Sequence, residues 1–119
     1  MIISDLVTPE FQREIVDVPE IQKDGQILIT EWNAEQAMKF NNLMWELNQN
    51  PEDKKNFSLF MACMVAMSMI KENGELLVNP DHFRELPKIF HPKAFERLYD
   101  KAAAMNGFTP QIIEKAKKN

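Results

Sequence analysis

The first third of the chain carries short apolar runs typical of extended segments. Residues 13–18 alternate only in part and stop at Pro19, which cannot donate to a strand ladder. Residues 26–32 are rich in β-branched and aromatic side chains, which favour strands. Lys23-Asp24-Gly25 lies between the two runs, and Asp-Gly is a strong turn signal. We therefore expect a short hairpin or β-ribbon over residues 13–31.

The hydrophobic period then changes to that of a helix. Apolar residues recur at i, i+3, i+4 and i+7, in the order Phe40, Leu43, Met44 and Leu47. This spacing places them on one face of an amphipathic helix. Asn33 can cap that helix, and Gln36 stands at the capping-box position. The pattern predicts a helix over residues 34–48.

A second helix start follows at Asn50-Pro51-Glu52-Asp53. It combines a capping residue, a proline at the first helical position and acidic groups near the positive helix end. We expect this helix to run to about Lys71 and to stop at Asn73-Gly74, where glycine can end it. A brief extended piece over residues 75–78 follows.

Prolines divide the rest of the chain. Asn79-Pro80-Asp81 starts a short helix that Pro87 should end. His91-Pro92 opens another helix, which Asn106-Gly107 closes. Its apolar stripe is Phe95, Leu98, Tyr99, Ala102 and Met105. Thr109-Pro110 should cap a last helix.

Length and composition are those of one globular domain. The chain has 119 residues, of which 45% are hydrophobic and 27% charged. Cys63 is its only cysteine, which excludes a disulfide framework and favours a small buried apolar role for the thiol. We expect a single, mainly α domain over residues 1–119, a compact bundle of about five helices with a short N-terminal β-hairpin. Residues 1–12 form an N-terminal arm, and residues 114–119 a basic tail.

Several function classes are disfavoured. A net charge of -4 argues against a general nucleic-acid binder. No catalytic or nucleotide-binding fingerprint is present, so we expect no enzyme and no cofactor. His82, His91 and Cys63 lack the close spacing of metal ligands, so no metal site is expected. The start of the chain is unlike a secretory signal, and the lone cysteine fits a reducing cytoplasm.

Charge is unevenly distributed along the chain. Residues 1–60 carry 5 basic and 11 acidic side chains, whereas residues 61–119 carry 9 and 7. This asymmetry permits head-to-tail self-association or an oppositely charged partner. Solvated faces that merely differ in charge are the simpler explanation.

The most informative segment is Phe57–Ile70, FSLFMACMVAMSMI, which is apolar on all sides as a helix. Its 14 residues are too few for a membrane span, which needs about 20. A helix of this kind is either a central core helix or one shared with a partner. Its closely spaced methionines would make an adaptable binding surface. The candidate client or subunit interface comprises Phe60, Met64, Met67 and Ile70.

The whole layout resembles the tail assembly chaperones of lambda-like siphoviruses, bacteriophages with long, non-contractile tails. The resemblance covers about residues 13–119 and rests on the order of its segments. These are Val18-Pro19-Glu20, extended Ile27–Thr30, a helix opening at Asn33-Ala34-Glu35, a long apolar helix running into Lys71–Glu75, extended Leu76–Val78 before a short acidic helix, and a closing Phe95–Ala102 followed by Met105–Phe108. The chain departs from the family at Pro19-Glu20-Ile21, where many relatives have an aromatic after the acid.

This resemblance implies a non-enzymatic role in the host bacterial cytoplasm. Family members are mainly helical, self-associate and coat the tape measure protein before tail tube subunits polymerise, and they are absent from the mature virion. Many of their genes also make a frameshifted longer form that recruits the tube protein. Ala116-Lys117-Lys118 can be encoded by an A-rich slippery run, so we hypothesise a programmed frameshift there. A solvated, basic helix end is the simpler explanation of the same residues. The alternatives are a small cytoplasmic helical adaptor or transcription-regulating protein, and a structural head–tail connector component.

Overall fold

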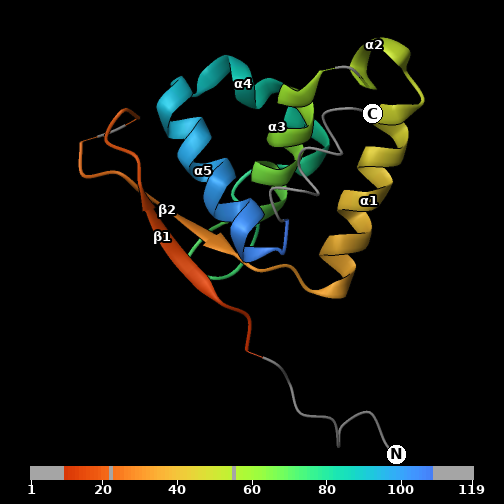
Figure 1. Ribbon diagram of the computed structural model, residues 1–119. Coiled ribbons are helices and arrows are strands. Elements are labelled where there is room, and N and C mark those ends of the chain that lie inside the picture. Colours follow the sequence, from red (N-terminus) through yellow and green to blue (C-terminus); the bar gives the residue numbers. More distant parts are fainter. Residues whose placement is uncertain (1–9, 22, 55, 109–119) are drawn as a thin grey trace, which may run out of the picture.

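The computed structural model describes residues 10–21, 23–54 and 56–108. A small antiparallel sheet lies at one side of the molecule, and the helices are arranged beside it with α3 between α5 and α1 (Figure 1). Along the chain, the elements are β1 (Arg13–Asp17), β2 (Gln26–Thr30), α1 (Ala34–Asn48), α2 (Pro51–Lys54), α3 (Phe57–Ser68), β3 (Met69–Ile70), a 3₁₀ helix (Pro80–Glu85), α4 (Leu86–Ile89) and α5 (Pro92–Met105).

The predicted hairpin is confirmed. β1 and β2 pair antiparallel, from Arg13 opposite Thr30 to Asp17 opposite Gln26. Asp24 adopts the left-handed conformation, with φ of 58°, in the connection between them. The amide of Val18 donates to the carbonyl of Gly25 at 2.9 Å and extends the pairing by one step.

The sheet has a third strand that the sequence pattern did not predict. α3 ends at Ser68 rather than near Lys71, and the next two residues form β3. Leu28 of β2 lies opposite Ile70, which gives the strand order β1-β2-β3. The expected extended piece after it is present only as a single bridge between Ile70 and Leu76. Two residues are too few to show a period of two, so this strand left no pattern to detect.

The long helix predicted from Pro51 to Lys71 is wrong as a single element. α2 is one turn, and α3 begins separately with Asn56 as its cap. The side chain of Asn56 accepts a hydrogen bond from the amide of Ser58 at 3.1 Å. Asn50 does cap α2 as expected, accepting from the amide of Glu52 at 3.0 Å. Each short polar side chain satisfies one free amide of its helix start, so two caps define two helices.

The role predicted for Pro87 is also wrong. Pro87 lies at the start of α4 instead of ending the preceding helix, because the first turn of a helix does not use that amide. α5 follows the prediction: His91 caps it, with Nδ1 accepting from the amide of Lys93 at 3.1 Å. The helix expected after Thr109-Pro110 lies outside the described residues.

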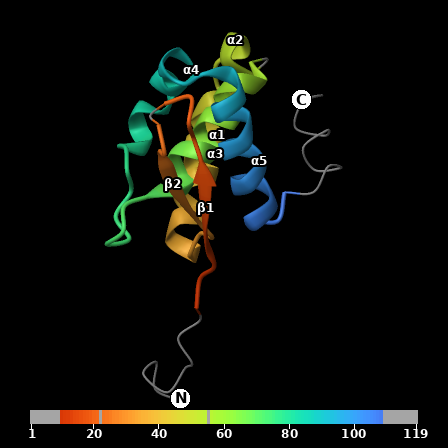
Figure 2. The same cartoon turned by 90° about the vertical axis from the view of Figure 1, so that its left-hand side faces the viewer.

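The fold-class prediction is confirmed in part: the chain is largely helical and has the N-terminal hairpin, but its three-stranded sheet makes it a mixed α/β domain rather than a five-helix bundle. The helices share one core with the three-stranded sheet, so hairpin residues such as Val16, Val18 and Ile29 are buried with them. α3 is the centre of this core and contacts α1, α4, α5 and the 3₁₀ helix. Figure 2 shows β1 and β2 on the near side, with α1 and α3 behind them. An all-round apolar helix needs such cover on every side.

Candidate binding surface

Three of the four residues predicted to form an interface are core residues. Met64, Met67 and Ile70 expose 0%, 1% and 3% of their surface. They are buried because helices cover α3 on several sides and β3 joins the sheet. The prediction that they present a surface to a client or subunit is therefore wrong for the folded chain, and the alternative of a central core helix describes α3.

Phe60, the fourth predicted residue, is half-buried in an aromatic cluster. Its ring centroid lies 5.3 Å from that of Phe57, 5.8 Å from that of Phe40 and 5.9 Å from that of Phe108. These rings come from α1, α3 and the residues that follow α5. Aromatic contacts of this kind hold elements together, so Phe60 has a packing role in the fold.

A polar junction fixes the start of α1 against the ends of α3 and α5. The indole Nε1 of Trp32 donates to Oγ of Ser68 at 2.9 Å, and that hydroxyl donates to the carbonyl of Met64 at 2.7 Å. The backbone amide of Trp32 donates to Oδ1 of Asn106 at 2.7 Å. Hydrogen bonds among partly buried groups are costly to break, so α1 has a defined position on the core.

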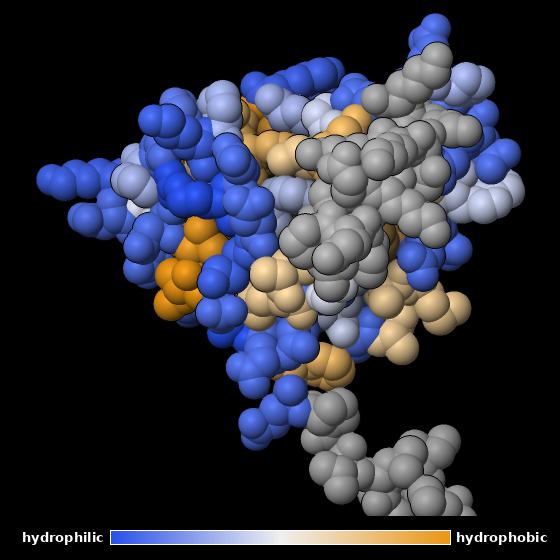
Figure 3. Space-filling model, viewed as in Figure 1, coloured by the Kyte–Doolittle hydropathy of each residue, from blue (hydrophilic) through white to orange (hydrophobic). Residues whose placement is uncertain are grey.

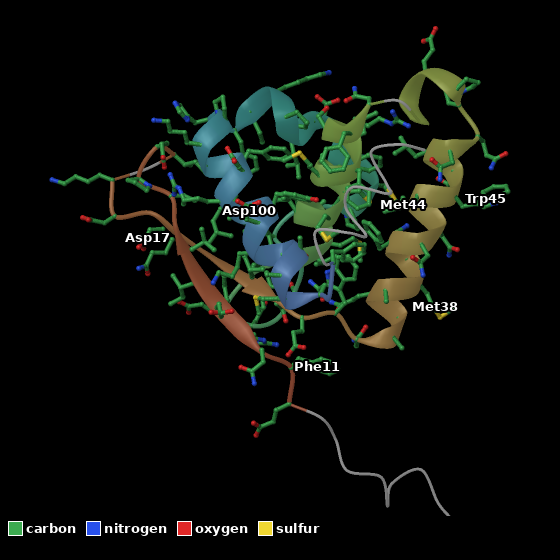
Figure 4. All side chains as sticks on the ribbon, viewed as in Figure 1. Phe11, Asp17, Met38, Met44, Trp45 and Asp100 are labelled. Atoms are coloured by element: carbon green, nitrogen blue, oxygen red, sulfur yellow. The ribbon has the colours of Figure 1, made fainter. Side chains whose placement is uncertain are left out.

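The outward side of α1 carries two large apolar residues. Met38 and Trp45 expose 65% and 66% of their surface. They are seven residues apart, which places them on one line along the helix. Asn42 lies between them, exposed and uncharged. Figure 4 shows Met38 and Trp45 pointing away from the body of the molecule, with Met44 on the inner side of α1. We call Met38, Asn42 and Trp45 the α1 outer stripe.

A groove runs beside this stripe, between α1 and the chain near Leu76 and Pro80. Its volume is about 380 Å³, Met38 and Asn42 line one side, and Met67 lies at its floor. One predicted residue thus borders a groove although almost none of its surface is exposed. The stripe and the groove together form a shallow apolar track along α1.

An ion pair lies beside this groove. Nζ of Lys39, which lines the groove, lies 2.7 Å from Oδ1 of Asp81. The hydrogen bond to that carboxylate raises the pKa of Lys39. Lys39 therefore stays charged at neutral pH, and its contact with Asp81 links α1 to the 3₁₀ helix.

Other exposed apolar side chains lie elsewhere on the described surface, and two of them, Ile15 and Leu77, line a second groove beside the sheet. Ile15 on β1 and Ile89 on α4 expose 58% and 69% of their surface. Figure 3 shows apolar patches separated by hydrophilic residues on the face seen there. Isolated apolar residues are ordinary on protein surfaces. The α1 outer stripe differs because its two large residues, a methionine and a tryptophan, are each about two-thirds exposed and lie on one line of a single helix.

The most perturbed titratable groups lie away from this stripe. Burial raises the pKa of the Cys63 thiol and of the Tyr99 phenol to about 12. Both side chains are in the core, and the Tyr99 hydroxyl has no hydrogen-bond partner among the described residues. Cys63 therefore has the buried apolar role that the sequence predicts. Burial, and secondly Glu96, also raises the pKa of Asp100 on α5.

Within the described ranges, no cluster of three or more histidine, cysteine or acidic residues could hold a metal ion. In that same part of the chain, no helix has the length and apolar character needed to span a bilayer.

The arrangement on α1 is suited to non-covalent binding of an apolar partner. Sequence reasoning missed it, although Met38 and Trp45 were visible as large apolar residues off the inward stripe.

Neither a family model, nor a curated protein, nor a solved structure matches this chain.

Proposed function

We propose that this protein is a phage or prophage tail assembly chaperone, which self-associates and keeps the tape measure protein soluble before the tail tube polymerises. The observation that carries the proposal is the α1 outer stripe with its groove. An exposed tryptophan and methionine on one line offer a partner helix an apolar track without disturbing the fold.

The chemistry of the stripe matches the expected client. A tape measure protein is a long helix with an apolar stripe, which aggregates unless it is covered. Tryptophan provides a large rigid anchor, and methionine adapts to varied neighbours. Asn42 adds no charge between them, so successive client segments of different sequence can bind with little discrimination.

The resemblance over residues 13–119 supports the same role. It adds the host cytoplasm as the site of action, absence from the mature virion, and a longer frameshifted form that recruits tail tube protein. The proposed frameshift site at residues 116–118 lies outside the described residues.

Co-expression with the tape measure protein of the same phage genome tests the proposal. Wild-type chain should keep the tape measure protein in the soluble fraction and co-purify with it. Met38→Asp combined with Trp45→Ala should reduce co-purification about tenfold, since losing anchor contacts costs about 1–2 kcal/mol. Ile89→Asp is the matched control, because Ile89 is equally exposed but lies on α4.

Equal recovery with the Met38/Trp45 variant and the wild type would contradict the proposal. So would salt-sensitive DNA binding by the purified chain, which marks a regulator. Recovery of the chain from purified virions would favour a connector component instead.

A further inference from the structure

β1 is an edge strand of the sheet, paired with β2 on one side only. The amide of Val18 donates to Gly25 and the carbonyl of Gln12 accepts from Glu31, so both residues direct their backbone groups toward β2. Backbone groups alternate along a strand. Those of Arg13, Ile15 and Asp17 therefore face outward, along the edge.

A groove follows this edge, between β1 and α5. Its volume is about 340 Å³, and it is lined by Ile15, Val16, Arg97, Asp100, Lys101 and Ala104. Figure 1 shows α5 running beside the hairpin over the length of β1, and Figure 2 shows the two elements side by side. A slot between an edge strand and a helix is the geometry in which extended segments bind by strand addition.

The charges lining the groove are partly committed to the fold. The guanidinium of Arg97 donates to the carbonyl of Asp17 and to the carboxylate of Glu20. Nζ of Lys101 lies 3.3 Å from Oε1 of Glu14. These contacts hold α5 against β1. The Asp17 carbonyl keeps a second lone pair, and the outward backbone amides of β1 can still pair with another chain.

The segment that fits this groove is residues 2–8, Ile-Ile-Ser-Asp-Leu-Val-Thr. These residues are outside the described ranges. β-branched and other apolar side chains favour a strand, and seven residues span about 23 Å at 3.3 Å each, enough to follow β1. Asp5 is the only charged side chain among residues 1–9. Arg97 and Lys101 line the groove beside Asp100, each of the two cations being paired with a glutamate. Pro9 cannot donate to a ladder and ends the run.

The turn chemistry favours a second copy over the same chain. A two-residue reversal at Pro9-Glu10 is the tightest way for the segment to pair with its own β1. Tight two-residue hairpin loops need a positive φ at their first central residue, whereas proline holds φ near −65°. An arm reaching a neighbour needs no tight turn at this point.

We infer that the groove between β1 and α5 binds residues 2–8 of a second copy of the chain as an added strand. Arm and groove are different surfaces, so the contact is head-to-tail and assembles a ring or an open filament. This contact specifies how the copies associate, and it stands without the proposed client because it uses neither Met38 nor Trp45.

Sedimentation of the purified full-length chain, without client, tests the inference. The wild type should exceed the mass of a monomer, increasingly so at higher concentration. Asp5→Pro/Leu6→Pro removes two neighbouring amides, one of which faces β1 in either register, and should be monomeric. Ala104→Arg fills the groove from an exposed position and should also be monomeric. Asp5→Glu/Leu6→Ile and Ala104→Ser are the matched controls and should assemble like the wild type.

Mixing the two monomeric variants is the decisive step. One retains an intact groove and the other an intact arm, so an equimolar mixture should form a 1:1 dimer with twice the monomer mass and no larger species. If circular dichroism shows that Ala104→Arg is unfolded, Ile15→Pro replaces it, because the Ile15 amide faces outward and proline is tolerated on an edge strand.

Three results would overturn the inference: a monomeric wild type, as pairing within one chain would give; oligomers that persist in either blocked variant; or a mixture that stays monomeric. Met38→Asp should assemble like the wild type. Loss of client binding by that variant therefore reports on the proposed function alone.

Discussion

α1 and α3 are both helices of this core, but they place their apolar residues differently. α3 is apolar on every side, and its methionines are buried by neighbouring elements. α1 buries one stripe and leaves Met38 and Trp45 exposed on the opposite side. The more hydrophobic helix is therefore the structural one, and the less hydrophobic helix carries the surface that a partner can reach.

The comparison teaches that apolar content alone does not identify an interface. A methionine-rich helix attracts attention as an adaptable surface, yet its side chains are needed to fill the core. An apolar residue that the fold does not bury is the more informative signal, because nothing within the folded chain accounts for it.

The largest effect is expected from a charge placed within α3. Met64→Asp should prevent folding, because an unpaired charge in the core costs several kcal/mol. Circular dichroism on heating should show no cooperative transition. A cooperative transition near the wild-type midpoint would contradict the assignment of α3 to the core.

A smaller loss is expected where α3 meets the start of α1. Ser68→Ala leaves the Trp32 indole N–H without its acceptor and should cost about 1–3 kcal/mol in urea unfolding. Ser58→Ala is the control, since that hydroxyl bonds the exposed side chain of Asn56. Equal losses for the two variants would mean that the junction does not position α1.

The buried thiol of α3 predicts a dependence of stability on pH. The pKa of Cys63 is about 12 in the folded chain, against an ordinary value near 9. As pH rises from 9 toward 12, the unfolded chain loses a proton that the folded chain keeps, so the free energy of unfolding falls. Cys63→Ala removes this contribution, so its stability relative to the wild type should improve as pH rises. A constant difference in urea unfolding between pH 7 and pH 10.5 would contradict the burial of the thiol.

The smallest effect on stability is expected on α1. Met38→Asp should change the free energy of unfolding by no more than about 0.5 kcal/mol, as surface substitutions usually do. A loss above about 2 kcal/mol would show that Met38 supports the fold, which removes the reason to assign it to a partner.

The local chemistry of this sequence was sufficient for the elements with strong signals. The capping box at Asn33 and Gln36 and the inward stripe of α1 are formed as expected. The hairpin around Asp24-Gly25 and the cap at His91 are formed as well. In each case, residues within a few positions of one another determine the local structure.

The features that were missed depend on distant residues or on competing signals. β3 exists because β2 lies beside it, and two residues carry no period of their own. Asn56 divides the expected long helix, although the apolar run after it reads as continuous. The burial of Met64 and the exposure of Trp45 are decided by which elements cover each helix, and the apolar period alone did not reveal that.

Contact between the α1 outer stripe and the client can be followed by acrylamide quenching of tryptophan fluorescence. The chain has two tryptophans, of which Trp32 is half-buried and Trp45 exposed, so the quenchable emission arises mainly from Trp45. A tryptophan-free helical segment of the tape measure protein should protect this emission, and Trp45→Phe should abolish the protected component. Quenching that is unchanged while the segment is bound would contradict the account.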